Sequence, residues 1–204
     1  MDNVKRMRDG LIYDCGDERI ADSQIVYLDK LWEFNQLKPS QLLEKEEYMK
    51  STFAECGENC YIELPFHANW GGSNVHFGNN VYANFNLTLV DDGQIFVGDN
   101  VMFGPNVVVA TPNHPILPEL RKKGYQYNRD VVIGNNVWIG AGAIIVPGIT
   151  IGDNSVIGAG SVVTHDIPAN VVAVGNPCQV LREISEHDRE YYYKTDKIDW
   201  ESID

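Results

Sequence analysis

The pattern of apolar positions changes near residue 60. Upstream of that point, apolar residues recur at helical spacing, first over residues 20–34 and then over residues 39–53. The side chains expected to face a core are Ile25, Leu28, Leu31 and Trp32 in the first segment and Leu42, Leu43, Tyr48, Met49 and Phe53 in the second. Proline is tolerated in a first helical turn, so the second helix is expected to begin at about Pro39. Residues 1–58 are therefore predicted to form an α-helical N-terminal cap.

Downstream of residue 60, apolar residues recur every six positions. Six successive markers are β-branched and aliphatic: Ile133, Ile139, Ile145, Ile151, Ile157 and Val163. A helix repeats about every 3.6 residues and a strand about every 2, so neither alone produces this period. A triangular prism does, because each flat side is one short strand and each corner is a turn, and hexapeptide repeats are a signature of β-helices. The markers are expected to point inward and to stack on those of the next coil.

The same phase extends upstream, with a two-residue slip near Gly93. The upstream markers are Phe77, Ala83, Leu89, Val97, Phe103 and Val109. The residue four positions after each marker is also small or aliphatic, and glycine and asparagine, which adopt positive φ most easily, are expected at the corners. We therefore predict a mainly β protein in which residues 59–177 form a parallel β-helix. The turn sequence Gly175-Asn176-Pro177 ends it, and residues 178–204 form a short tail in which a short helix is expected.

The hexads are interrupted between Val109 and Ile133. The intervening residues 111–130 include three prolines and a basic run at 121–123. A loop of this length inside a compact domain is often functional. It contains His114 between Asn113 and Pro115. We predict that residues 111–130 protrude from the prism and carry a functional histidine.

Composition limits the classes of partner. The chain has 204 residues and a formal charge of −13, from 29 acidic and 16 basic residues. It contains no extended basic run of the kind that binds nucleic acid. It also lacks the apolar stretch of a signal peptide or of a membrane span. The four cysteines lack metal-finger spacing. We expect a cytoplasmic protein with reduced thiols, without a nucleic-acid partner, membrane association or bound metal.

Several motifs outside the hexads carry a family resemblance. They are Gly10-Leu11-Ile12-Tyr13, Tyr82-Ala83-Asn84-Phe85-Asn86, Val90-Asp91-Asp92, Ile133-Gly134-Asn135-Asn136-Val137-Trp138-Ile139-Gly140 and Val174-Gly175-Asn176-Pro177. Together with the histidine loop and the cap, they resemble the maltose and galactoside O-acetyltransferase group of the hexapeptide-repeat acyltransferases, over nearly the whole chain. The resemblance implies a left-handed coil and a homotrimer with active sites between subunits. It also implies transfer of acetyl from acetyl-CoA to a hydroxyl of a sugar such as maltose or a galactoside, with no metal required.

The resemblance also assigns roles to residues. His114 matches the family's catalytic base, and a histidine with a reference pKa of about 6.5 is substantially neutral at pH 7. The residues implied to hold the acceptor sugar are Asp14, Asn69, Asn84, Asp92 and Trp138. Those implied to contact CoA are Ala141, Ala159, Thr164, His165 and Arg182. Asp91, beside Asp92, is expected to be a turn residue. The acidic contact from the cap falls between Asp14 and Asp17, without a fixed register.

The sequence departs from the galactoside pattern at three places. Gln179 replaces a second arginine on the CoA side, and Gln126 replaces an apolar residue of the histidine loop. The run from Asn69 to Asn74 is one residue longer than its galactoside counterpart. These departures leave the acceptor open, and the alternative is a hexapeptide acetyltransferase acting on an amino acid, an amino sugar or an antibiotic.

Two other classes fit less well. The β-helical carbonic anhydrases hold zinc with three histidines, but no histidine lies within ten residues of His114. A non-catalytic β-helical scaffold has no need of a histidine in this Asn-His-Pro context.

Overall fold

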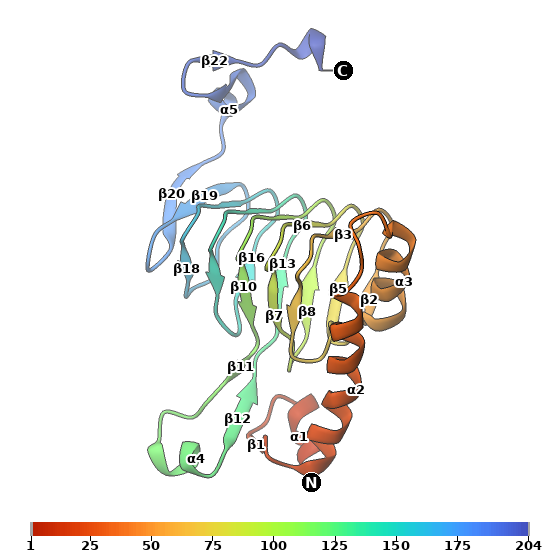
Figure 1. Cartoon of the computed structure of the whole chain (residues 1–204). Coiled ribbons are helices and arrows are strands. Elements are labelled where there is room, and N and C mark those ends of the chain that lie inside the picture. Colours follow the sequence, from red (N-terminus) through yellow and green to blue (C-terminus); the bar gives the residue numbers. More distant parts are fainter. Residues whose placement is uncertain (1, 204) are drawn as a thin grey trace.

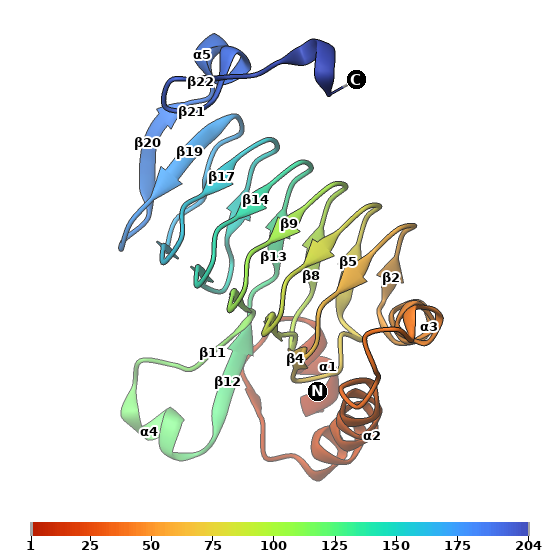
Figure 2. The same cartoon turned by 45° about the horizontal axis from the view of Figure 1, so that its top comes forward.

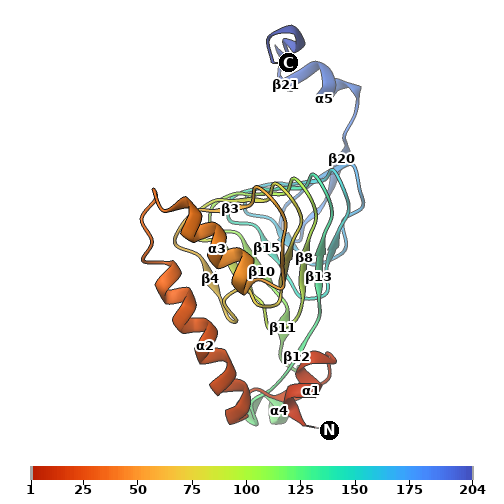
Figure 3. The same cartoon turned by 90° about the vertical axis from the view of Figure 1, so that its right-hand side faces the viewer.

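The body of the molecule is a triangular β-solenoid of about six turns with helices at its N-terminal end (Figure 1). The computed structural model describes residues 2–203. Three parallel sheets form the sides of the prism, and a view at right angles shows its triangular outline (Figure 3). The chain runs from the first sheet to the second, then to the third, and returns to the first.

The elements have the following bounds. The first sheet comprises β2 (Glu55–Cys56), β5 (Val75–Phe77), β8 (Ile95–Val97), β13 (Val131–Ile133) and β16 (Thr150–Ile151). The second comprises β3 (Tyr61–Ile62), β6 (Tyr82–Ala83), β9 (Met102–Phe103), β14 (Trp138–Ile139), β17 (Val156–Ile157), β19 (Val171–Val174) and β20 (Gln179–Glu183), the last antiparallel to β19. The third comprises β4 (His67–Ala68), β7 (Thr88–Val90), β10 (Val108–Ala110), β15 (Ile144–Ile145) and β18 (Val162–Val163).

The remaining elements lie outside the prism walls. The helices are α1 (Asn3–Arg8), α2 (Glu18–Phe34), α3 (Leu42–Thr52), α4 (Pro118–Lys122), α5 (Glu186–Glu190) and the 3₁₀ helix η1 (Trp200–Ser202). The remaining strands are β1 (Tyr13–Asp14), β11 (Pro112–Asn113), β12 (Tyr125–Asn128), β21 (Tyr191–Tyr193) and β22 (Asp196–Lys197).

The inward ladder predicted from the six-residue period is confirmed. The markers from Ile133 to Val163 are all at most 1% exposed. The positions four residues later, such as Val137 and Ala143, are buried as well. Each coil therefore contributes two inward side chains at every corner, and stacking the coils builds one continuous apolar core.

Asparagines stabilise the corner between the first and second sheets. Asn80, Asn100 and Asn136 have φ near +57°, +58° and +56°. The amide of Asn80 donates to Asn100, and the amide of Asn100 donates to Asn136, at 3.0 Å in both cases. Asparagine tolerates this left-handed conformation, and its amide both donates and accepts. A column of asparagines can therefore bridge coils along the whole prism.

The length of a coil varies at one of the three corners, and the candidate site is built at that corner. Val132 pairs with Thr150, eighteen residues later, which is the regular spacing. Val75 pairs with Ile95, twenty residues later, and Ile95 pairs with Val131, thirty-six residues later. The extra residues lie between the third sheet and the first. This edge, which we call the insertion edge, carries Asp92 and the loop of residues 111–130.

The helical cap is present, but its buried face is narrower than the periodicity predicted. Leu31 and Met49 are buried. Five apolar residues that were expected to face the core are exposed instead: Ile25, Leu28, Trp32, Leu42 and Leu43. The prediction was wrong for these five because α2 and α3 each contact the prism along one narrow stripe. The second helix begins at Leu42 rather than Pro39, because the residues before it form a turn.

The C-terminal tail leaves the prism after β20 and extends away from it (Figure 1). A short helix is present at α5, as expected. Arg182 lies on strand β20, which pairs with β19 and extends the second sheet.

Candidate active site

The insertion of residues 111–130 forms an arm, here called the strap, that projects from the insertion edge (Figures 1 and 2). Its strands β11 and β12 are antiparallel, and α4 lies at its tip. On its other side β12 pairs with β1 of the cap. The cap and the strap therefore form one three-stranded sheet, which fixes the position of the residue that follows β11, His114.

The imidazole of His114 is oriented by one hydrogen bond. Its Nδ1 lies 2.9 Å from the carbonyl oxygen of Tyr125. A carbonyl oxygen can only accept, so Nδ1 donates, and in the neutral ring the lone pair is on Nε2. The side chain is exposed. In the neutral imidazole, the strap therefore presents Nε2 and its lone pair at the surface.

Asp92 and Asn69 lie together on the insertion edge, one coil apart. The carboxylate of Asp92 accepts a hydrogen bond from the amide of Asn69 at 2.8 Å and one from Gln126 at 3.2 Å. Burial raises the pKa of Asp92, while hydrogen bonds from these two amides act in the opposite direction. The structure therefore joins two of the predicted acceptor residues directly.

Asp91 has the turn role expected of it. Its fully buried carboxylate accepts the backbone N–H of Trp70 at 2.7 Å and that of Gly72 at 3.0 Å. Burial raises the pKa of Asp91 to about 6. Asp91 thereby anchors the longer 69–74 segment, and Asp92 is left to face the site.

Sequence reasoning named Gln126 as a departure on the acceptor side but did not find the hydrogen-bonded residues that join it to Asp92, Tyr13 and Asn128. The amide of Gln126 donates to both Asp92 and the phenol oxygen of Tyr13. The hydroxyl of Tyr13 donates to Asn128 at 3.4 Å, and the amide of Asn128 donates to the carbonyl of Asp92 at 2.8 Å. Burial raises the pKa of Tyr13 to about 12. The only signal in the sequence was the polar residue at position 126, where the resemblance implies an apolar one.

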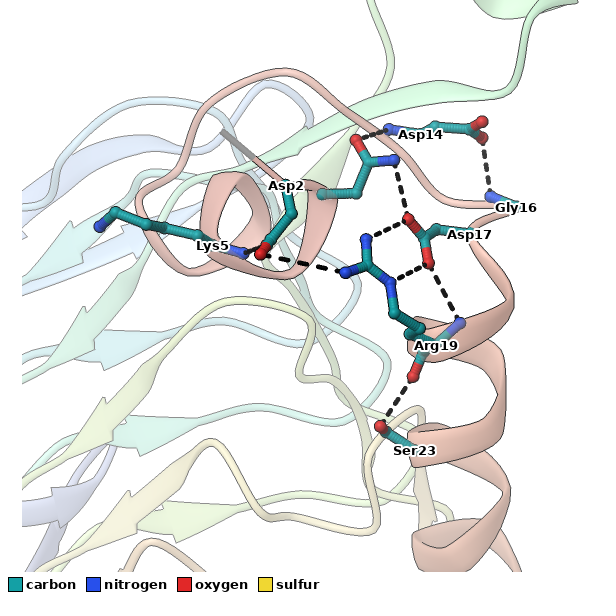
Figure 4. A network of polar contacts seen from close by, with 8 residues as sticks. Asp2, Lys5, Asp14, Gly16, Asp17, Arg19 and Ser23 are labelled. Atoms are coloured by element: carbon teal, nitrogen blue, oxygen red, sulfur yellow. Dashed lines mark hydrogen bonds and ion pairs between the residues drawn. The ribbon is translucent and has the colours of Figure 1, made fainter.

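Asp17 serves the cap rather than the site. It caps α2, where its carboxylate accepts the backbone N–H of Arg19 at 3.1 Å and pairs with the Arg19 guanidinium at 2.8 Å (Figure 4). The amide of Asn3 donates to it at 3.0 Å. The hydrogen bonds from Arg19 hold the pKa of Asp17 well below its usual range.

Asp14 is the cap carboxylate that borders the strap. It lies on β1 directly opposite Tyr125, whose carbonyl orients His114. Its carboxylate accepts the backbone N–H of Gly16 at 2.9 Å (Figure 4). The geometry therefore favours Asp14 over Asp17 as the acidic residue near the histidine.

Three other candidates lie on a different edge, between the second and third sheets, and a fourth, Trp138, lies on the adjoining face of the second sheet. Asn84 follows β6, and Ala141 and Ala159 follow β14 and β17 at equivalent positions of their coils. The N–H of Gly160 donates to the carbonyl of Ala141 at 2.8 Å, so the two alanine turns stack. Trp138 projects outward from β14 and is 52% exposed. We call this the alanine edge.

The last candidates for CoA lie apart from the alanine edge. Thr164 and His165 follow β18 and are linked by a 2.9 Å contact between Oγ1 and Nδ1. Arg182 forms a bidentate ion pair with Asp188, at 2.6 Å and 2.7 Å. The guanidinium therefore already has an anionic partner in this structure.

The histidine and the alanine edge are not joined within the chain. Among residues 2–203, no hydrogen bond or ion pair links the strap to the turns at Ala141 and Ala159. Over the same residues, no set of three or more His, Cys, Asp or Glu side chains is arranged to hold a metal ion. No helix in that part of the chain has the length and apolar character of a membrane span.

Comparison with known proteins agrees with this architecture. Residues 6–57 match the maltose acetyltransferase hexapeptide capping motif, and residues 130–165 match the bacterial transferase hexapeptide family. The chain is 53% identical to a galactoside O-acetyltransferase of Lactococcus lactis over 98% of its own length and 96% of the relative. It is 47% identical to the galactoside O-acetyltransferase of Escherichia coli, with 98% of both chains covered.

The solved structures give the same result. A galactoside acetyltransferase in complex with coenzyme A superposes with a TM-score of 0.93 at 47% identity, covering 98% of this chain and 99% of the other. A maltose O-acetyltransferase from Clostridium difficile superposes with a TM-score of 0.88 at 42% identity, covering 91% and 98%. The fold is therefore the left-handed parallel β-helix implied by the resemblance. The chain belongs to the maltose and galactoside O-acetyltransferase group of the hexapeptide-repeat acyltransferases.

Proposed function

We propose that this enzyme, an acetyl-CoA-dependent O-acetyltransferase of sugars, uses His114 as its general base. The observation that carries the proposal is the hydrogen bond from Nδ1 to the carbonyl of Tyr125, which leaves Nε2 free to accept a proton. Nε2 removes the proton of a sugar hydroxyl as its oxygen attacks the thioester carbonyl. The tetrahedral intermediate then collapses, the carbon–sulfur bond breaks, and the imidazolium returns the proton to the CoA sulfur. The products are the acetyl ester and CoA with a free thiol.

The acceptor is proposed to bind beside the strap. One chain is proposed to supply Asp14, Asp92 and Asn69, and the alanine edge of a neighbouring copy to supply Asn84. The side-chain oxygens of all four accept hydrogen bonds from hydroxyl groups. Trp138 supplies an exposed aromatic face of the kind that packs against a sugar ring. Support comes from the relatives named galactoside and maltose O-acetyltransferases.

The donor is proposed to bind along the alanine edge. A backbone N–H at Ala141 is suited to the oxyanion of the tetrahedral intermediate, because a backbone donor does not depend on the side chain. Ala159, Thr164 and His165 are proposed to contact the rest of CoA. Arg182 is proposed to contact a phosphate, to which its planar guanidinium is suited. The coenzyme A bound to a structural neighbour supports this assignment.

The enzyme is proposed to act as a homotrimer in the cytoplasm. The strap and the alanine edge of one chain lie on different edges of the prism, so a neighbouring copy is needed to bring a strap to an alanine edge. Exposed apolar side chains such as Trp32, 66% exposed, and Ile25, 59% exposed, fit an interface. Sedimentation at a mass other than three chains would contradict the trimer. The free cysteines suit a reducing compartment.

The test is release of CoA thiol from acetyl-CoA across a panel of mono- and disaccharides. His114→Ala should lower kcat by the ~10²–10⁴-fold typical of losing a general base. Acetyl-CoA binding, measured by calorimetry, should change little. His67→Ala, which removes an exposed histidine from β4, is the matched control and should leave the rate unchanged. An unaltered rate in His114→Ala would refute the role of this residue.

A further inference from the structure

The carboxylate of Asp92 is held from the strap by a single side chain, Gln126. An ionised carboxylate can only accept, so the Gln126 amide must turn its nitrogen toward it, and the 3.2 Å contact to Oδ1 has that sense. The second N–H of the same amide donates to the phenol oxygen of Tyr13. Gln126 is 8% exposed, so its side chain is confined to this geometry.

These contacts close into a ring. From Gln126 the chain of hydrogen bonds passes to Tyr13, from Tyr13 to Asn128, and from Asn128 back to the backbone carbonyl of Asp92. The ring joins β1 of the cap, β12 of the strap and the Asp92 turn of the prism. Gln126 also directly follows Tyr125, whose carbonyl orients His114. The carboxylate and the histidine are therefore both tied to one short stretch of β12.

We propose that Gln126 is a positioning residue that fixes the Asp92 carboxylate as a receptor for two neighbouring hydroxyls of the acceptor and keeps it in register with His114. This inference rests on the proposed function of the same site. Gln126 acts through Asp92 and the strap, so it requires no contact with the reacting atoms.

The number of free lone pairs on the Asp92 carboxylate indicates which class of molecule receives the acetyl group. A carboxylate has about four lone-pair positions, two on each oxygen. Gln126 occupies one on Oδ1, and Asn69 occupies one on Oδ2 at 2.8 Å. The buried indole N–H of Trp70 also acts on this carboxylate, but it has no partner at hydrogen-bonding distance among the described residues. By the hydrogen bonds formed in the structure, one position therefore remains on each oxygen. Two adjacent hydroxyls of a sugar ring can donate to such a pair of oxygens together, whereas an acceptor with one hydroxyl can use only one of them.

The groups around Asp92 determine in which direction its pKa changes when Gln126 is removed. The titratable groups that face it are Asp91, Tyr13 and Cys15. The charged residues of the 540 Å³ cavity that Asp92 also lines are Arg8, Asp9, Arg129 and Asp130. Burial raises the pKa of Asp92, and the side chains of Asn69, Gln126 and Trp70 lower it. Loss of Gln126 therefore raises that pKa, so the ionised form is lost at a higher pH.

The kinetic test compares three variants. Gln126→Leu removes the donor, and Gln126→Glu places a second carboxyl beside Asp92. Gln94→Leu removes a neighbouring amide that bonds His76 and Asn74 instead, and it is the matched control. Gln126→Leu is expected to lower kcat/KM for a vicinal-diol sugar by roughly ten- to a hundredfold, the range for losing a hydrogen bond to a charged group. KM for acetyl-CoA should be unchanged.

The pH profile separates positioning from general damage. The acid limb of kcat/KM should move to higher pH in Gln126→Leu and further in Gln126→Glu, because two close carboxyls raise each other's pKa. Gln94→Leu should keep the wild-type limb. A sugar in which one of the two adjacent hydroxyls is replaced by hydrogen should also be tested. Gln126→Leu should lower kcat/KM for this deoxy sugar by a smaller factor than for the intact sugar.

A second measurement does not depend on acetyl transfer. The Asp92 carboxyl carbon can be followed by NMR in ¹³C-aspartate-labelled, ligand-free enzyme and assigned by its absence in Asp92→Asn. Its titration midpoint should be higher in Gln126→Leu than in wild type. If no sugar is acetylated at all, the proposed function fails, and this titration still decides whether Gln126 acts on Asp92. An unchanged midpoint, or an unchanged acid limb in an active enzyme, overturns the proposal.

Discussion

The buried carboxylate of Asp91 should make the fold more stable as the pH falls toward 5. Its side chain is fully buried, and its pKa is raised from an ordinary value of 3.8 to about 6. A carboxyl whose pKa is raised in the folded state is protonated more readily there than in the unfolded chain. The unfolding free energy therefore rises as the pH falls through 6, and the gain is complete only below the unfolded value.

The magnitude follows from the shift. About two pKa units correspond to about 3 kcal/mol between the fully ionised and the fully protonated limits. Roughly 1.4 kcal/mol of this should appear between pH 8 and pH 5. That window stays above the isoelectric point of about 4.7, near which the protein is least soluble. Asp91→Asn cannot titrate and should lack this contribution.

The assay is urea unfolding of wild type and Asp91→Asn at several pH values. Other titrating groups contribute to both proteins and cancel in the difference. The amide introduced by Asp91→Asn keeps an oxygen for the Trp70 N–H but turns its NH₂ group toward the Gly72 N–H, a cost that is independent of pH. The stability advantage of wild type should therefore widen as the pH falls.

Ile151→Val provides the control. It should cost about 0.5–1.5 kcal/mol by shortening the inward ladder without changing any charge. A plot of its unfolding free energy against pH should run parallel to that of wild type. If the Asp91→Asn curve is also parallel, the reasoning about the raised pKa is refuted.

Two further predictions concern the corner column and the phosphate contact. Asn100→Ala should lower the unfolding free energy by about 1–3 kcal/mol, because alanine is strained at the positive φ and two hydrogen bonds of the asparagine column are lost. Asn100→Gly should lower it by less, because glycine adopts this φ without strain. Urea unfolding of both variants measures the difference. An equal loss in both would exclude the φ contribution. Arg182→Ala should weaken binding of CoA more than that of a dephosphorylated CoA in calorimetry, whereas Asp188→Asn should strengthen CoA binding by releasing the guanidinium. Equal losses for both ligands in Arg182→Ala would contradict a phosphate contact.

The fold could be predicted from the sequence because its core is periodic. Each marker from Ile133 to Val163 makes the same contact one coil further on, so a short-range spacing encodes a long-range structure. Periodicity did not predict burial correctly on α2, where Ile25 and Trp32 have helical spacing but are exposed. Helical spacing identifies an apolar face, but the number of apolar residues that are covered depends on how the helix lies against the prism.

The site was only partly predictable for a related reason. His114 stood out because it lies in an interruption of the repeat. The ring through Tyr13 and Asn128 joins residues 115 positions apart, and no local pattern encodes such a contact. Likewise, no local pattern separates Asp17 from Asp14. They differ in the folded chain, where Asp17 caps α2 and Asp14 lies opposite Tyr125 of the strap.

The variable coil length at the insertion edge has a consequence for how such enzymes diversify. The coil that carries the strap is thirty-six residues long, yet its strands pair with the coils before and after it in the same way as those of an eighteen-residue coil. Strand pairing restricts the sides of the prism but places no limit on the length of chain between them. New segments can therefore be acquired at a corner without disturbing the scaffold. Evolution can thus change the chemistry and the acceptor of this fold by insertion, while the repeat that folds it is inherited unchanged.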